Sequence, residues 1–269
     1  MHGMIQEWTL YLGFGSLAGL LSGLFGIGGG VIIVPFLAWW FAARGFAPES
    51  IMIMAVATSL ATIVVTSLSA AHAHHRRGAV DWRTVRRLAP GILLGAVLGS
   101  VIADHLPARG LKLIFTCFLL YVAMRMLLSP KPENPVARTP ATGLFALAGT
   151  SIGLLSSILG IGGGTLSVPF LVKCRYPIRQ AVAISSACGF PIALAGAVSY
   201  ILLGWTKTTL PPWSLGYVYL PALLGILLTS VPFAPLGARL AHRWPTARLR
   251  TLLALVLIAV GGKMLWQAL

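Results

Sequence analysis

Two glycine-rich stretches contain the residues of this sequence best suited to bind a solute. The first, GLFGIGGGVIIVPFL, covers residues 23–37, and the second, SILGIGGGTLSVPFL, covers residues 157–171. Without a Cβ atom, glycine lets the backbone approach a ligand closely and adopts left-handed conformations at little cost. A helix that begins directly after such a run presents free N–H groups and about half a positive charge. The two stretches therefore predict anion binding by backbone amides.

A short helix of roughly 8 to 12 residues is expected after each glycine run, beginning at Val31 and at Thr165. Pro35 and Pro169 follow the last glycine of each run by five residues and are expected to bend or end these helices. Close packing of helices is the alternative role for such glycines. A dinucleotide-binding G-x-G-x-x-G motif does not fit, because Val31 and Thr165 stand where its last glycine belongs.

Hydroxyl side chains near both runs would add hydrogen-bond donors to such a site. One serine lies a turn before each run, and further hydroxyls follow where AVATSL from Ala55 matches AVAISS from Ala181, although Ile184 replaces the threonine of the first copy. A single membrane serine more often bonds its own backbone, so only the recurrence in both copies favours binding. The candidate substrate-binding residues are Ser22, Gly26, Gly28, Gly29, Gly30, Val31, Thr58, Ser59, Ser156, Gly160, Gly162, Gly163, Gly164, Thr165, Ser185 and Ser186.

The rest of the sequence has the composition of a membrane protein. Of the 269 residues, 57% are hydrophobic and 9% are charged, and the mean hydropathy is +0.88, whereas about a quarter of the residues in a soluble domain are charged. About eight apolar segments are long enough to enter or cross a hydrocarbon core of roughly 30 Å, which predicts an all-α polytopic membrane protein. These segments cover residues 8–25, 51–71, 88–103, 111–128, 142–159, 181–203, 217–236 and 249–265.

The two halves of the chain are copies of each other. Residues 19–37 and 153–171 are identical at 13 of 19 positions without a gap. A polar, proline-rich linker, residues 129–141, separates a first membrane repeat, residues 1–128, from a second, residues 142–269. Repeated halves of this kind are typical of secondary transporters.

The basic residues distinguish parallel repeats from inverted ones. If all eight segments cross the membrane, ten Lys and Arg residues fall on each side, which gives no positive-inside signal. If each glycine-broken segment is a re-entrant hairpin, fifteen fall on one side and only Arg44, Arg109, Lys112, Lys207 and Lys263 on the other. The sequence therefore predicts two inverted repeats, each a re-entrant or discontinuous helix plus three transmembrane helices, with both termini outside the cytoplasm. The alternative is that the basic residues became distributed without regard to topology after the duplication, so that their positions carry no information on orientation.

Several functional classes are disfavoured. The net charge of +15 does not indicate nucleic-acid binding, because the basic residues lie in short loops between apolar segments. No nucleophile–base pair, metal-ligand spacing or Walker motif appears, so we predict neither an enzyme nor a metal or cofactor. The three cysteines show no CxxC spacing and indicate no disulfide framework. The N-terminal segment lacks the features of a cleaved signal peptide and is expected to be retained.

Coupling to protons or sodium has no obvious carrier in the sequence, because intramembrane carboxylates usually provide it. An inside-negative potential drives anions outward at about 2.3 kcal/mol per charge per 100 mV, so export is the expected direction. Arg125 and Lys263 are expected to extend to the membrane interface rather than hold an anion. The acidic residues, all at segment ends or in loops, are Glu7, Glu49, Asp81, Asp104 and Glu133.

The repeated GIGGG run followed by VPFL, together with AVATSL and AVAISS, resembles the TauE/SafE sulfite exporter family over essentially the whole chain. The resemblance implies export of sulfite, or of organosulfonates such as sulfoacetate, across the inner (plasma) membrane of a bacterium. We therefore expect a secondary transporter that holds its anion between the two GIGGG helix starts. The expected partners are a small anionic substrate and the lipid bilayer, and a homodimer remains open. The alternatives are a passive anion channel and a non-transporting membrane assembly factor.

Overall fold

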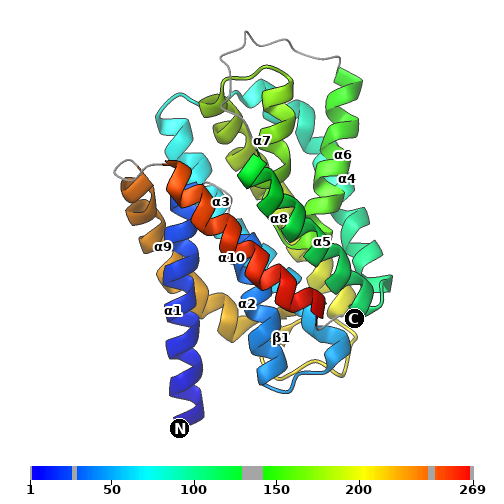
Figure 1. Cartoon of the computed structure of the whole chain (residues 1–269). Coiled ribbons are helices and arrows are strands. Elements are labelled where there is room, and N and C mark those ends of the chain that lie inside the picture. Colours follow the sequence, from blue (N-terminus) through cyan, green and yellow to red (C-terminus); the bar gives the residue numbers. More distant parts are fainter. Residues whose placement is uncertain (1, 26–28, 129–141, 242–245, 267–269) are drawn as a thin grey trace.

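The computed structural model describes residues 2–25, 29–128, 142–241 and 246–266 (Figure 1). The predicted linker lies outside these residues. The first half contains α1 (His2–Phe25), α2 (Gly30–Ala43), α3 (Pro48–Arg76), α4 (Trp82–His105) and α5 (Ala108–Leu128). The second half contains α6 (Thr142–Leu159), α7 (Gly164–Lys173), α8 (Ile178–Gly204), β1 (Ser214–Leu215), β2 (Val218–Tyr219), α9 (Leu220–Ala241) and α10 (Thr246–Trp266).

The helices confirm an all-α membrane architecture. Among the described residues, α3, α4, α5 and α8 are long and apolar enough to cross a membrane, and α2 and parts of α6, α9 and α10 are shorter apolar helices. Helix α3 packs against α8, and α5 packs against α10. Helix α1 packs along α9, and α6 packs along α4. In the order of the two halves, α1 to α5 correspond to α6 to α10. The α3–α8 and α5–α10 pairs thus join corresponding helices, and the α1–α9 pair corresponds to the α6–α4 pair.

Helices α1 and α2 run antiparallel and form a hairpin, with Gly29 and Gly30 at the start of its second arm. Glu7 forms an ion pair with Arg44. The indole N–H of Trp40 donates a hydrogen bond of 3.0 Å to the hydroxyl of Tyr11. The rings of Phe14 and Phe36 stack with their centroids 3.5 Å apart. Residue numbers rise along α1 as they fall along α2. The start of α1 and the end of α2 therefore lie together at one end of the molecule.

Helices α6 and α7 form the corresponding hairpin around the second break. Phe145, near the start of α6, packs edge-to-face on Phe170, near the end of α7, with ring centroids 6.0 Å apart. The start of α6 and the end of α7 therefore also lie together.

The two hairpins open at opposite ends of α4. Tyr176, in the turn after α7, shares a hydrogen bond of 2.8 Å with Thr84 in the first turn of α4. At the other end of α4, Tyr217 donates a hydrogen bond of 2.6 Å to Asp104. The turn after α2 lies beside this second end, through the ring contacts Phe41–Tyr219 and Phe46–Tyr219. Twenty residues of helix, or about 30 Å, separate the two ends.

The tips of the two hairpins lie against each other. A Cβ atom on Gly30 would collide with the carbonyl oxygen of Gly160 and would lie 2.9 Å from Cα of Ile161. Ser59, on α3, donates a hydrogen bond of 2.8 Å to the same Gly160 oxygen. Gly29 and Gly160 have φ angles of +76° and +65°, which other residues adopt only with strain. Glycine is therefore needed both for the turns and for the contact between them.

The expected length is wrong for α2, and one of the two effects expected of the prolines, ending the helix, does not occur. Helix α2 has 14 residues, more than predicted, while α7 has 10. Neither Pro35 nor Pro169 ends its helix, because α2 continues to Ala43 and α7 to Lys173. A proline removes one backbone hydrogen bond, and membrane helices packed among neighbours tolerate this loss.

Candidate functional site

Four hydroxyl groups near the second break are buried and have no hydrogen-bond partner within the described part of the chain. They belong to Ser156 at the end of α6, Thr165 and Ser167 in the first turns of α7, and Ser185 on α8. The residues Ser156, Ser167 and Ser185 are at most 1% exposed. Each buried polar group without a hydrogen-bond partner lowers the stability of the fold by about 1–3 kcal/mol. Four such hydroxyls near one helix break indicate a candidate binding site for a polar ligand.

Gly163 lies among these hydroxyl residues. A Cβ atom built on Gly163 would lie 3.0 Å from Oγ of Ser167 and 3.1 Å from the backbone oxygen of Ser185. The N–H of Ile161 donates a hydrogen bond of 3.0 Å to the backbone oxygen of Ser156. Gly163 thus lies between α7 and α8, while Ile161 connects the second break to the end of α6.

The start of α7 adds backbone donors to this group. Leu166 and Ser167 donate hydrogen bonds of 3.2 Å and 2.7 Å to the carbonyl oxygen of Gly163. The N–H groups of Gly164 and Thr165 precede these bonds and so have no carbonyl of α7 to bond. The first turn of α7 contains no acidic side chain. Free amides and the helix dipole favour an anion at this position.

Three other predicted hydroxyls are occupied by backbone hydrogen bonds. Ser59 bonds to the second break, as described above. Thr58 accepts a hydrogen bond of 3.0 Å from the backbone N–H of Tyr219. Ser186 donates a hydrogen bond of 2.9 Å to the carbonyl oxygen of Val182 on its own helix. The structure therefore gives these hydroxyls structural partners and places only part of the predicted set around the start of α7.

The first break differs from the second in chemistry. Where α7 has Thr165 and Ser167, the corresponding positions of α2 hold Val31 and Ile33. The described part of the first break is thus apolar, and the polar group belongs to the second half. Sequence reasoning missed Ser167, although its hydroxyl two residues beyond Thr165, absent from the first copy, was a visible signal. Three predicted positions, Gly26, Gly28 and the side chain of Ser22, lie outside the described residues.

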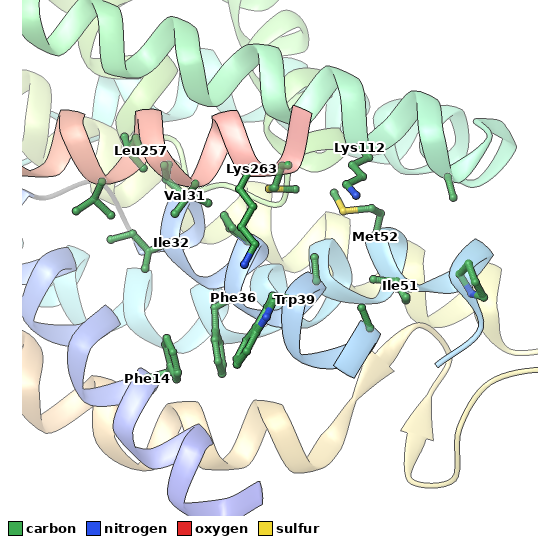
Figure 2. Close-up of a pocket in the computed structure, with 18 of the residues that line it drawn as sticks. Phe14, Val31, Ile32, Phe36, Trp39, Ile51, Met52, Lys112, Leu257 and Lys263 are labelled. Atoms are coloured by element: carbon green, nitrogen blue, oxygen red, sulfur yellow. The ribbon is translucent and has the colours of Figure 1, made fainter. Parts of the chain in front are cut away.

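A cavity of about 950 Å³ lies beside the first break, among α1, α2, α3, α5 and α10 (Figure 2). Its walls are mostly apolar and include Val31, with Glu49, Arg109, Lys112 and Lys263 among the lining residues. None of the residues that line it belongs to the second glycine motif. The cavity and the hydroxyl residues around the start of α7 are therefore separate features.

The fold and the paired helix breaks define a polytopic membrane protein of the transporter class. The chain belongs to the family described as sulfite exporter TauE/SafE, whose model matches residues 11–264. It is 39% identical to a probable membrane transporter protein of Haemophilus influenzae, over 93% of this chain and 95% of the relative. A probable membrane transporter protein of Methanocaldococcus jannaschii is 28% identical, over 93% of this chain and 92% of the relative. A further one, from Bacillus subtilis, is 26% identical, over 98% of this chain and 99% of the relative. No solved structure matches the chain.

Family and fold together agree with the predicted location, a multi-pass protein of the bacterial inner membrane.

Ser59 and Ser185 occupy matching positions in the two halves and give a matched pair of variants. Ser59→Ala should lower the free energy of unfolding by about 1 kcal/mol, because it removes a buried hydrogen bond. Ser185→Ala should not lower it, because its hydroxyl has no partner among the described residues. Thermal unfolding of the purified variants in detergent measures the difference. Equal destabilisation by both variants would show that Ser185 has a structural partner.

Proposed function

We propose that this protein is a secondary transporter that exports sulfite or organosulfonates from the cytoplasm and binds the anion at the start of α7. The observation that supports this proposal most strongly is the group of four unpartnered buried hydroxyls. They lie around a helix start whose first amides are free of intrahelical bonds. A sulfite or sulfonate group presents three oxygens that accept hydrogen bonds from such donors.

The donors at this site are neutral, and that suits transport. Hydroxyl and N–H groups near a helix start can hold an anion that has lost its water. A permeating ion must bind well enough to enter and weakly enough to leave. Neutral donors bind an anion less tightly than a buried cationic side chain would, so the anion can be released on the other side of the membrane.

The two hairpins support an inverted-repeat topology with alternating access. The α6–α7 hairpin opens at the end of the molecule where Tyr176 meets Thr84, and the α1–α2 hairpin opens at the other end. The end with Tyr176 also holds the arginine-rich turn between α3 and α4, including Arg76 and Arg77. The positive-inside rule assigns this end to the cytoplasm. The site at α7 would then load from the cytoplasm, and the membrane potential would drive the anion outward.

The closed tips favour a transporter over a passive channel. Gly160, Ile161 and Gly163 are buried, and Gly30 packs directly on the backbone of Gly160. A channel needs an open path past this point, whereas alternating access needs a barrier that opens on one side at a time. The hairpin tips are suited to form that barrier.

Counterflow in proteoliposomes tests the proposed site. The wild type should show uptake of labelled sulfite or sulfoacetate that is stimulated by the same anion inside. Combining Ser167→Ala with Ser185→Ala should weaken the apparent affinity by about tenfold or more per hydroxyl, because a hydrogen bond to a charged group contributes about 1.5–3 kcal/mol.

The matched control is Ser151→Ala, an exposed serine of α6 that donates to the carbonyl oxygen of Leu147, and it should transport normally. Normal affinity in the double variant would overturn the site assignment. Uptake without stimulation would indicate a channel, and no flux of either sulfite or sulfoacetate would indicate a non-transporting protein.

A fluorescent reporter at the C-terminus tests the topology. The C-terminal helix α10 ends at the same end of the molecule as the hairpin opening of α1 and α2 (Figure 1). Inverted repeats with basic loops inside place this end outside the cytoplasm, so a fused green fluorescent protein should stay dark and a fused alkaline phosphatase should be active. The opposite pattern would contradict the inverted topology.

A further inference from the structure

The cavity beside the first break has its charged residues at one end. Arg109 and Lys112 belong to the first turns of α5, Lys263 to the last turn of α10, and Glu49 to the first turn of α3. Figure 2 shows Lys112 and Lys263 extending from α5 and α10 into the space toward α2 and α3. Three cations and one carboxylate leave this end with a net charge of +2.

The rest of the cavity is apolar. Phe14, Phe36, Leu257 and Val260 line it, and it reaches Val31 in the first turn of α2 (Figure 2). Val31 follows Gly30, which lies at the contact between the two breaks. The cavity therefore runs from a charged end of the molecule inward to its centre.

The length of the cavity matches half a bilayer. Helix α2 lines it from Val31 to Ala42, a rise of about 16 Å at 1.5 Å per residue. The hydrocarbon core is about 30 Å thick, so one leaflet contributes about half of that. Leu17, Trp39 and Val256 line the cavity and are 45%, 49% and 44% exposed. The wall of the cavity is therefore partly exposed at these residues.

We propose that this cavity binds an anionic phospholipid, with one acyl chain along the apolar wall and the phosphate between Lys112 and Lys263. A small soluble anion would occupy only the charged end and leave the apolar length empty. A neutral lipid would fill the length but would gain little from the net positive charge. The polarity and length of the cavity together fit a lipid of negative charge. This site is independent of the proposed anion site at α7.

Native mass spectrometry of the full-length protein tests this site. The protein is released from detergent with equal amounts of phosphatidylglycerol and phosphatidylcholine of the same chain length. The wild type should retain phosphatidylglycerol preferentially. Combining Lys112→Gln with Lys263→Gln should reduce that retention by about 25-fold, or about fivefold per lysine, and should leave phosphatidylcholine unchanged. The matched control is Lys207→Gln, an exposed lysine between α8 and β1, which should behave as wild type.

A second variant tests the apolar part with both lysines in place. Val260→Trp fills the cavity and should reduce retention of both lipids, whereas Leu255→Trp, on the exposed side of the same helix, should not. Val260→Phe replaces Val260→Trp if the larger side chain prevents folding. Equal retention of the two lipids by the wild type, or full retention by the double lysine variant, would overturn the proposal. Retention of added sulfoacetate in place of lipid, lost in the lysine variant, would instead make the cavity a passage for a soluble anion.

Discussion

A helix that breaks inside a membrane frees backbone groups that lipid cannot satisfy, so other protein groups must surround them. In this protein the two breaks meet each other. Gly30 packs on the backbone of Gly160, and Ser59 donates to the Gly160 carbonyl. This contact requires both hairpin tips at the centre, and it requires glycine where the chains touch. The contact joins the α1–α2 hairpin to the α6–α7 hairpin.

The two helix breaks differ in the residues that follow their glycines. The described part of the first break is apolar, with Val31 and Ile33 after its glycines, and it lies against a large cavity. At the second break, Thr165 and Ser167 bring hydroxyls close to free amides. The packing of the helices is nearly symmetric, while the chemistry is not. This difference is the reason why the proposed anion site lies in the second half only.

Local sequence signals predicted much of the fold. The glycine runs predicted the helix breaks, and the apolar segments predicted the membrane helices, because both depend on neighbouring residues. Long-range packing decides the rest. It places the Thr58 hydroxyl on the backbone N–H of Tyr219, more than a hundred residues away, a partner that the residues around Thr58 do not predict. It also leaves the Ser167 hydroxyl without a hydrogen-bond partner among the described residues, which the sequence around Ser167 does not predict.

In the proposed transporter, the hydroxyl residues around the start of α7 hold a sulfur oxyanion. A structure of the protein with selenite, the heavier analogue of sulfite, tests it most directly, because anomalous scattering locates selenium without ambiguity. We predict a selenium peak between the amides of Gly164 and Thr165 and the hydroxyls of Ser167 and Ser185. A peak only at the lysine-lined cavity, or only on the molecular surface, would show that the anion does not bind at the start of α7.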